Sequence, residues 1–137
     1  MRTIAGVEML VVLLVTGVIS ADASSNPVTS EAPFADLVAR ANRDMGTKQG
    51  NSYDVVMGKQ FASKHGSGVG ACVEASGAAV PESFQTVIIV GKNGMVSSVT
   101  VNPETEVAKC VRKLLINETF PKPPFAPFHD LMDMNFE

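Results

Sequence analysis

Residues 85–102, QTVIIVGKNGMVSSVTVN, constrain the fold more than any other part of the sequence. The apolar run at residues 86–90 and the returning run at residues 95–101 are rich in β-branched side chains, which favour strands. Between them lies Gly-Lys-Asn-Gly, and Asn-Gly in such a position is typical of a β-hairpin turn. The stretch predicts two antiparallel strands and therefore a small antiparallel sheet.

Upstream of the hairpin, apolar residues recur with the period of an α-helix rather than that of a strand. The first stripe consists of Phe34, Leu37, Val38, Ala41 and Met45. Gly46 follows this stripe, at a position where helices commonly end because glycine tolerates the left-handed conformation. A first helix is therefore predicted to end at Gly46.

A second helix is predicted to begin at Ser52, because serine is a good N-cap residue. Its inward-facing residues would be Val56, Met57 and Phe61. Lys64 and His65 would lie in its last turn, where cations are favoured, and Gly66 would end it. The glycine-rich residues that follow would then form a turn leading to Cys72.

A third helix is predicted after the hairpin, with Asn102 as its N-cap and Pro103 at its first position. Its buried stripe would consist of Val107, Cys110, Val111, Leu114 and Leu115. Residues 120–128 contain four prolines. Because proline lacks an amide donor, this segment is expected to be an extended connector.

The chain closes with residues 128–136, FHDLMDMNF, which predict a last strand. One face of this strand would carry Phe128, Met132, Met134 and Phe136. Asp130 interrupts that face, and we expect Asp130 and Asp133 to be solvated. The fold class is therefore α+β: a small antiparallel sheet of the hairpin and the C-terminal strand, with a helix packed on one face and helices before it.

The N-terminus has the pattern of a secretory signal sequence. Arg2 is followed by an apolar run at residues 9–19 and by Ala-Asp-Ala, a small-x-small cleavage site. The run is too short for the roughly 20 residues that span a bilayer. We expect a periplasmic or secreted protein with no membrane span after cleavage. Its predicted segments are a signal peptide at 1–23, a flexible lead at 24–32, a helical segment at 33–65 and an α+β domain at 66–137.

The chain has two cysteines, Cys72 and Cys110. In an oxidising compartment two such cysteines most often pair, so we predict a disulfide between them. Closing a loop of about 39 residues would stabilise the fold by roughly 4 kcal/mol through the entropy of the unfolded chain.

Residues 63–77, SKHGSGVGACVEASG, also invite two catalytic or ligand-binding interpretations. A thiol nucleophile at Cys72 with His65 as its base would need both residues on one helix face, and the intervening glycines argue against such a helix. A phosphate-binding loop would need Lys-Ser or Lys-Thr after its last glycine, where the sequence has Ala-Cys. We therefore expect no catalytic residue and no cofactor here.

Composition and charge exclude other classes of partner. The formal net charge is −3, and no basic run is present, so the sequence does not indicate binding to nucleic acid or to an anionic membrane. No Ser/His/Asp set suggests a hydrolase. The alternative that remains open is a copper site formed by His129, Met132 and Met134, because imidazole and thioether groups suit copper. The competing interpretation of these methionines is a half-buried strand.

Residues 72–137 resemble the C-terminal domain of TonB-family proteins, in its small periplasmic form with cysteines. The resemblance rests on the hairpin TVIIVGKNGMVSSVTV, the helix ETEVAKCVRKLLI and the Phe-Pro pair that leads into the last strand in TFPKPPFAPFHDLMDMNF. It implies a non-enzymatic periplasmic domain whose helix lies on a small antiparallel sheet. TonB proteins bind receptor segments by strand pairing.

A strand at a sheet edge offers unpaired backbone groups to another extended segment, unless the edge is solvated or covered. The sequence therefore predicts a small, exported, non-enzymatic and disulfide-linked module. Its expected partner is an envelope protein or peptide bound through sheet-edge pairing. The energy-transducing role of TonB is not part of this expectation, and the partner's identity and the oligomeric state stay open.

Overall fold

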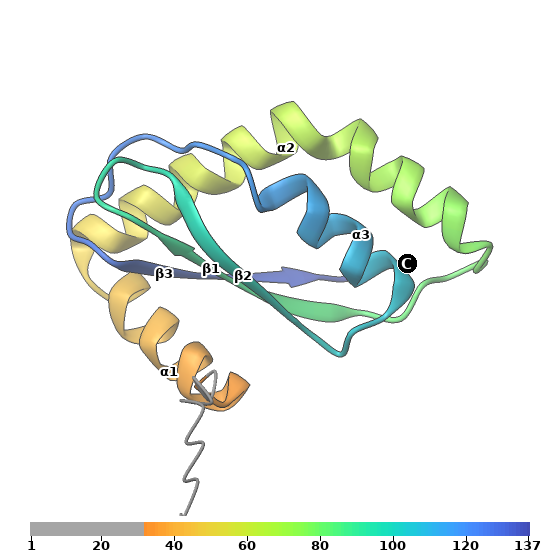
Figure 1. The fold of residues 1–137 in the computed structure, drawn as a ribbon, viewed down its shortest axis with the longest axis horizontal. Helices are drawn as coiled ribbons and strands as arrows, with labels where there is room; N and C mark the ends of the chain where they lie inside the picture. The colour runs from red at the N-terminus through yellow and green to blue at the C-terminus, as the bar shows by residue number, and fades with distance from the viewer. Residues whose placement is uncertain (1–31) are drawn as a thin grey trace, which may run out of the picture. The chain divides into compact units, whose positions relative to one another are not determined.

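In the computed structural model, which describes residues 32–137, helices flank a three-stranded antiparallel sheet (Figure 1). In chain order the elements are α1 (Phe34–Met45), α2 (Lys48–Ser76), β1 (Phe84–Val90), β2 (Val96–Asn102), α3 (Glu106–Leu115) and β3 (Phe128–Met134). The predicted α+β fold class is confirmed. The predicted signal peptide, and the predicted lead except for Ala32, lie outside the described residues.

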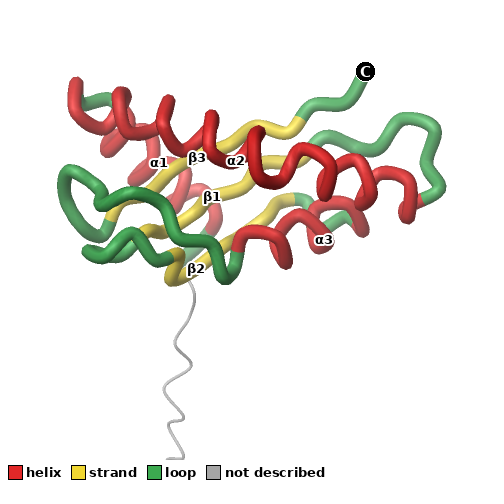
Figure 2. The backbone as a smooth tube through the Cα atoms, turned by 90° about the horizontal axis from the view of Figure 1, so that it is seen from above, coloured by secondary structure: helices red, strands yellow, loops and turns green. Residues whose placement is uncertain are grey.

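The strands are ordered β2-β1-β3, and both pairs are antiparallel. Figure 2 shows β1 between its two neighbours. The predicted hairpin is confirmed: the Gly94 amide donates to the carbonyl of Gly91 at 2.9 Å. Gly94 has a φ of 83°, and a Cβ there would lie 1.9 Å from the Phe120 carbonyl oxygen, so only glycine fits. β1 is the central strand because it pairs with β2 on one side and with β3 on the other.

The sheet is covered on both faces, by α2 and α3 on one side and by α1 on the other (Figure 1). Successive side chains of β1 point to opposite faces of the sheet. Ile88 and Val90 belong to the larger core, beneath α2 and α3. Val87, also fully buried, points to the opposite face, on the side of α1. Burial on both faces explains why the sequence of β1 is almost continuously apolar.

The second helix is much longer than the sequence predicts. The helix runs over 29 residues, from its N-cap Thr47 to Gly77, which has a φ of 69° and ends it. The predictions of a start at Ser52, an end at Gly66 and a turn after Gly66 are wrong. Helical glycine costs about 1 kcal/mol relative to alanine, but tertiary packing outweighs such a cost. At Gly68 a Cβ would lie 3.1 Å from Leu114 of α3, so this glycine allows close helix contact.

Two further local predictions are corrected. Val56 is 44% exposed rather than inward, whereas Tyr53, which the pattern overlooked, is buried. Asn102 is the last residue of β2, and the N-cap of α3 is Thr105, whose hydroxyl accepts from the Ala108 amide at 3.1 Å. Val56 and Asn102 suit these roles locally, but in the fold Tyr53 is the buried residue and Thr105 is the N-cap.

The division of the chain at residues 65 and 66 is also wrong. That boundary falls inside α2, and residues 32–137 belong to one contact unit. The proline-rich connector forms neither helix nor strand before Phe128, but it bends at Pro121 and at residues 124–127 instead of running extended as predicted. It is anchored to α2 because the Tyr53 hydroxyl donates to the Pro121 carbonyl at 2.6 Å. The helical segment is therefore part of the α+β domain.

Candidate functional site

The outer edge of β3 is covered by the end of α1. Asp44 Oδ2 accepts two hydrogen bonds from His129, one from its backbone amide at 3.0 Å and one from Nδ1 at 2.9 Å. The Leu131 amide donates to Sδ of Met45 at 3.2 Å. The strand lies at a sheet edge, as predicted, but two of its outward amides already have acceptors within the chain.

The pairing register then fixes which residues of β2 face outward. His129, Ile89 and Ser98 form one row across the sheet. Backbone groups alternate in direction along an antiparallel strand, and those of His129 point away from β1. Ile89 therefore points its backbone groups toward Ser98. Ser98 in turn points its backbone groups toward β1. Because the direction alternates along β2, the amides and carbonyls of Val99 and Val101 point away from the sheet.

The outer edge of β2 is open between its two ends. Near its start, the Val96 amide donates to the Glu118 carbonyl at 3.1 Å, and Met95 pairs with Thr119. Beyond that point, no described residue bonds the outward backbone groups of Val99 and Val101. The strand VSSVTVN has neither a charge nor a proline, the usual means by which proteins protect an edge. Within residues 32–137, β2 is therefore the less covered of the two sheet edges.

A cavity of about 220 Å³ lies beside this edge, on the α1 face of the sheet. It is lined by Ala32, Leu37, Arg40, Ile89, Ser98 and Thr100. Leu37 and Ile89 are apolar, while Ser98 and Thr100 supply hydroxyls from β2. Arg40 is the charged residue of this lining, and it forms no ion pair with another described residue.

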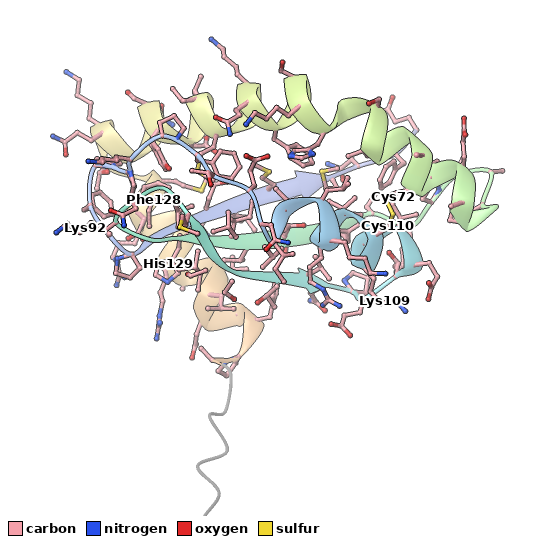
Figure 3. The ribbon with its side chains drawn as sticks, turned by 45° about the horizontal axis from the view of Figure 1, so that its top comes forward. Cys72, Lys92, Lys109, Cys110, Phe128 and His129 are labelled. Atoms are coloured by element: carbon pink, nitrogen blue, oxygen red, sulfur yellow. A yellow bond between two sulfur atoms is a disulfide. The ribbon has the colours of Figure 1, made fainter. Side chains whose placement is uncertain are left out.

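The predicted disulfide between Cys72 and Cys110 is confirmed. It joins α2 to α3, with its Cα atoms 5.7 Å apart (Figure 3). The thiol-nucleophile interpretation therefore fails, although His65 and Cys72 do lie on one helix. The sulfur of Cys72 is bonded to that of Cys110, and the imidazole of His65 is bonded to Glu118.

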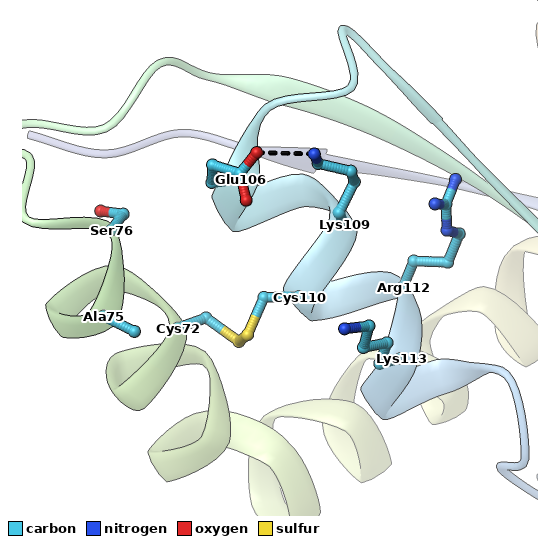
Figure 4. A pocket seen from close by; sticks show the side chains of 8 residues that line it. All are labelled: Cys72, Ala75, Ser76, Glu106, Lys109, Cys110, Arg112 and Lys113. Atoms are coloured by element: carbon cyan, nitrogen blue, oxygen red, sulfur yellow. Dashed lines mark hydrogen bonds and ion pairs between the residues drawn. A yellow bond between two sulfur atoms is a disulfide. The ribbon is translucent and has the colours of Figure 1, made fainter.

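A second cavity, of about 340 Å³, borders the disulfide (Figure 4). The basic residues around it are Lys109, Arg112 and Lys113. Lys109 donates to Glu106 at 2.6 Å, which lowers the pKa of that carboxyl. Arg112 donates to Glu104 at 2.9 Å. Because acidic residues of the same chain already neutralise two of the cations, we assign no ligand to this cavity.

Lys64 and His65 hold the segment after α3 rather than ending a helix. Glu118 accepts from Nζ of Lys64 at 3.2 Å and is bonded to Nε2 of His65 and to the Thr119 amide. Burial alone would raise the pKa of Glu118, but the hydrogen bonds from His65, Thr119 and Lys64 outweigh burial and lower it. This cluster fixes the backbone that pairs with the start of β2.

Asp130 is fully buried, so the prediction that it is solvated is wrong. Neither of its carboxylate oxygens has a hydrogen bond of ordinary geometry, and Thr86 nearby in the sheet also has an unpaired hydroxyl. Its pKa is raised from 3.8 to about 8, first by burial and then by the adjacent carboxyl of Asp54. Asp133, by contrast, is exposed and accepts from Gln85 at 2.8 Å.

The structure does not bring the three candidate copper ligands together. His129 points to the α1 face, where Asp44 occupies its Nδ1. Met132 and Met134 lie against the core on the other face. Neighbouring residues of a strand diverge in this way, as His129 and Phe128 do in Figure 3. Within the described part of the chain, no group of three His, Cys, Asp or Glu residues could hold a metal ion.

Comparisons with family models, curated proteins and solved structures gave no match to this chain. Among residues 32–137, no helix combines the length and apolar character that crossing a membrane requires. The candidate site is therefore defined by its own geometry: an open β2 edge beside a cavity with one arginine.

Three residues described above, Asp44, Arg40 and Glu118, could not be identified from the sequence. Asp44 reads as an ordinary polar residue near a helix end, and its contact with His129 spans 85 positions. Arg40 carries no motif, and Glu118 lies in a short loop. Asp130, which lies outside the β2 site, does have a signal in the sequence, because it stands on an otherwise apolar strand face.

Proposed function

We propose that this protein is an exported, non-enzymatic binding module that takes an extended segment of an envelope protein as a fourth strand beside β2. The observation that carries this proposal is the row of unpaired outward backbone groups at Val99 and Val101. Main-chain hydrogen bonds supply affinity in such strand addition, and neighbouring side-chain pockets supply specificity.

Three further features support the proposal. The disulfide fits an oxidising compartment such as the periplasm. The coverage of β3 by Asp44 and Met45 directs an incoming strand to the opposite edge. The resemblance to TonB C-terminal domains concerns a class of domain that binds by strand pairing, although the edge proposed here is that of the hairpin.

A display library of random peptides, selected on the oxidised protein, tests this function. Selected peptides should bind the Val99→Ala variant but not Val99→Pro. Both variants lose the packing of valine, but only proline removes the outward amide, and an edge strand tolerates proline at such a position. Circular dichroism would establish that both variants are folded. Equal binding by folded Val99→Pro and Val99→Ala would refute pairing at this edge, as would a library without any binder.

A further inference from the structure

The cavity beside β2 has the composition of a site for one carboxylate-bearing side chain. Its lining includes the apolar side chains of Leu37 and Ile89 and, from β2, the hydroxyl-bearing residues Ser98 and Thr100. Arg40 of α1 contributes the charge. Guanidinium groups bind carboxylates with paired hydrogen bonds, and hydroxyls can add further donors. A glutamate could lay its methylene groups on the apolar side chains and its carboxylate against these donors.

Among residues 32–137, the charged groups around Arg40 leave it without an ion-pair partner. On α1, the acidic residue of the first turn is Asp36, which forms no ion pair with Arg40. Asp44 at the other end of the helix is bound to His129 and lies near Arg43. The residues of β1 and β2 that line the cavity are uncharged. An acidic group entering the cavity would therefore meet a cation without displacing an ion pair of the described chain.

The register of an added strand places one side chain at this cavity. A strand bonded to Val99 and Val101 has one residue opposite Thr100, and opposite residues share a face of the sheet. That side chain points to the α1 face, where the cavity lies. The residues before and after it point to the other face, beside the valines and α3. The recognised pattern is thus apolar, acidic, apolar.

We infer that the segment bound by β2 carries an acidic side chain, flanked by two apolar ones, and that Arg40 selects it. This inference rests on the proposed strand pairing and adds a chemical preference to it. A second copy of this chain does not fit the pattern, because VSSVTVN contains no acidic residue.

Three synthetic peptides test the preference: a Val-Glu-Val core flanked by Thr and Ser, and the same peptide with Gln or Lys in place of Glu. Calorimetry should show that the Glu peptide binds roughly tenfold more tightly than the Gln peptide, about the contribution of one partly exposed charged pair. Arg40→Glu should reverse the order, so that the Lys peptide binds best. Lys59→Glu, on the exposed side of α2, makes the same change in net charge and should leave the order unchanged.

The outcomes separate the two proposals. Equal binding of the Glu, Gln and Lys peptides, lost in Val99→Pro, would overturn the role of Arg40 and leave strand pairing intact. Absence of binding by all three peptides and by every library peptide would overturn both. A dimer that light scattering detects and Val99→Pro dissolves would show that a second copy occupies the edge, which would contradict the acidic partner.

Discussion

Asp44 and His129 join the end of α1 to the outer edge of β3 through two hydrogen bonds that share one carboxylate oxygen. Asp44 is 7% exposed and His129 is 6% exposed, so both bonds are shielded from water. The contact does more than attach a helix. It gives an outward amide of β3 an acceptor within the chain, so that β2 is the less covered edge of the described sheet.

Replacing Asp44 with alanine should destabilise the fold by about 2 kcal/mol, because the buried amide and ring nitrogen of His129 lose their acceptor. Urea denaturation would measure the change, and hydrogen exchange at the His129 amide should accelerate. Arg43→Ala is the matched control, since Arg43 is exposed and its Nε lies 3.7 Å from the other carboxylate oxygen of Asp44, a contact that contributes little to stability. Equal stability of the two variants would contradict the role of Asp44.

The sequence predicted the sheet well because its signals are local. The Asn-Gly turn and the β-branched runs specify the hairpin without reference to distant residues, and β1 and β2 differ from the predicted strands only at their ends. The pairing of Cys72 with Cys110 is predictable because the chain has two cysteines, so that one intramolecular pairing is possible.

Features that depend on distant contacts could not be predicted in this way. The glycines of α2 favour a break in the helix locally. The contacts that favour a continuous helix, Gly68 against Leu114 and the disulfide of Cys72, are made with α3, which is distant in the sequence. Likewise, the identity of the open edge depends on Asp44, whose partner is 85 positions away. The position of Arg40 in the cavity beside β2 depends on how α1 packs on the sheet, which no local sequence pattern indicates.

Alanine substitutions along α2 test its continuous path. Gly66 faces open space, so Gly66→Ala should stabilise the protein by up to about 1 kcal/mol through helix propensity. Gly68→Ala should gain less or lose stability, because its Cβ would lie 3.1 Å from Leu114. Thermal and urea denaturation would rank the two variants. A destabilised Gly66→Ala would indicate that the glycines form a turn rather than a helix.

Removing the disulfide should lower the free energy of unfolding by about 4 kcal/mol, the entropy expected for a closed loop of this length. The variant to compare is Cys72→Ala with Cys110→Ala, measured against the oxidised protein by urea denaturation. The wild-type protein under reducing conditions should approach the double variant. A double variant as stable as the oxidised protein would show that packing alone holds α2 on α3.

The buried carboxyl of Asp130 should make stability fall as the pH rises. Its pKa is about 8 in the folded protein and near 3.8 when exposed, so between these values the folded state binds more protons than the unfolded state. Stability should therefore be highest near pH 4 and decline toward about pH 8. Asp130→Asn should flatten this decline, whereas the exposed control Asp133→Asn should preserve it. An unchanged slope in Asp130→Asn would show that another group is responsible.

Hydrogen exchange at the amides of Val99 and Val101, measured by NMR with and without a selected peptide, tests strand pairing most directly. Both amides should exchange readily in the free protein, because they face outward without an acceptor in the described chain. A saturating peptide should slow their exchange strongly, while the His129 amide, already bonded to Asp44, should change little. Slowed exchange at β3 with no change at Val99 and Val101 would contradict binding at the β2 edge.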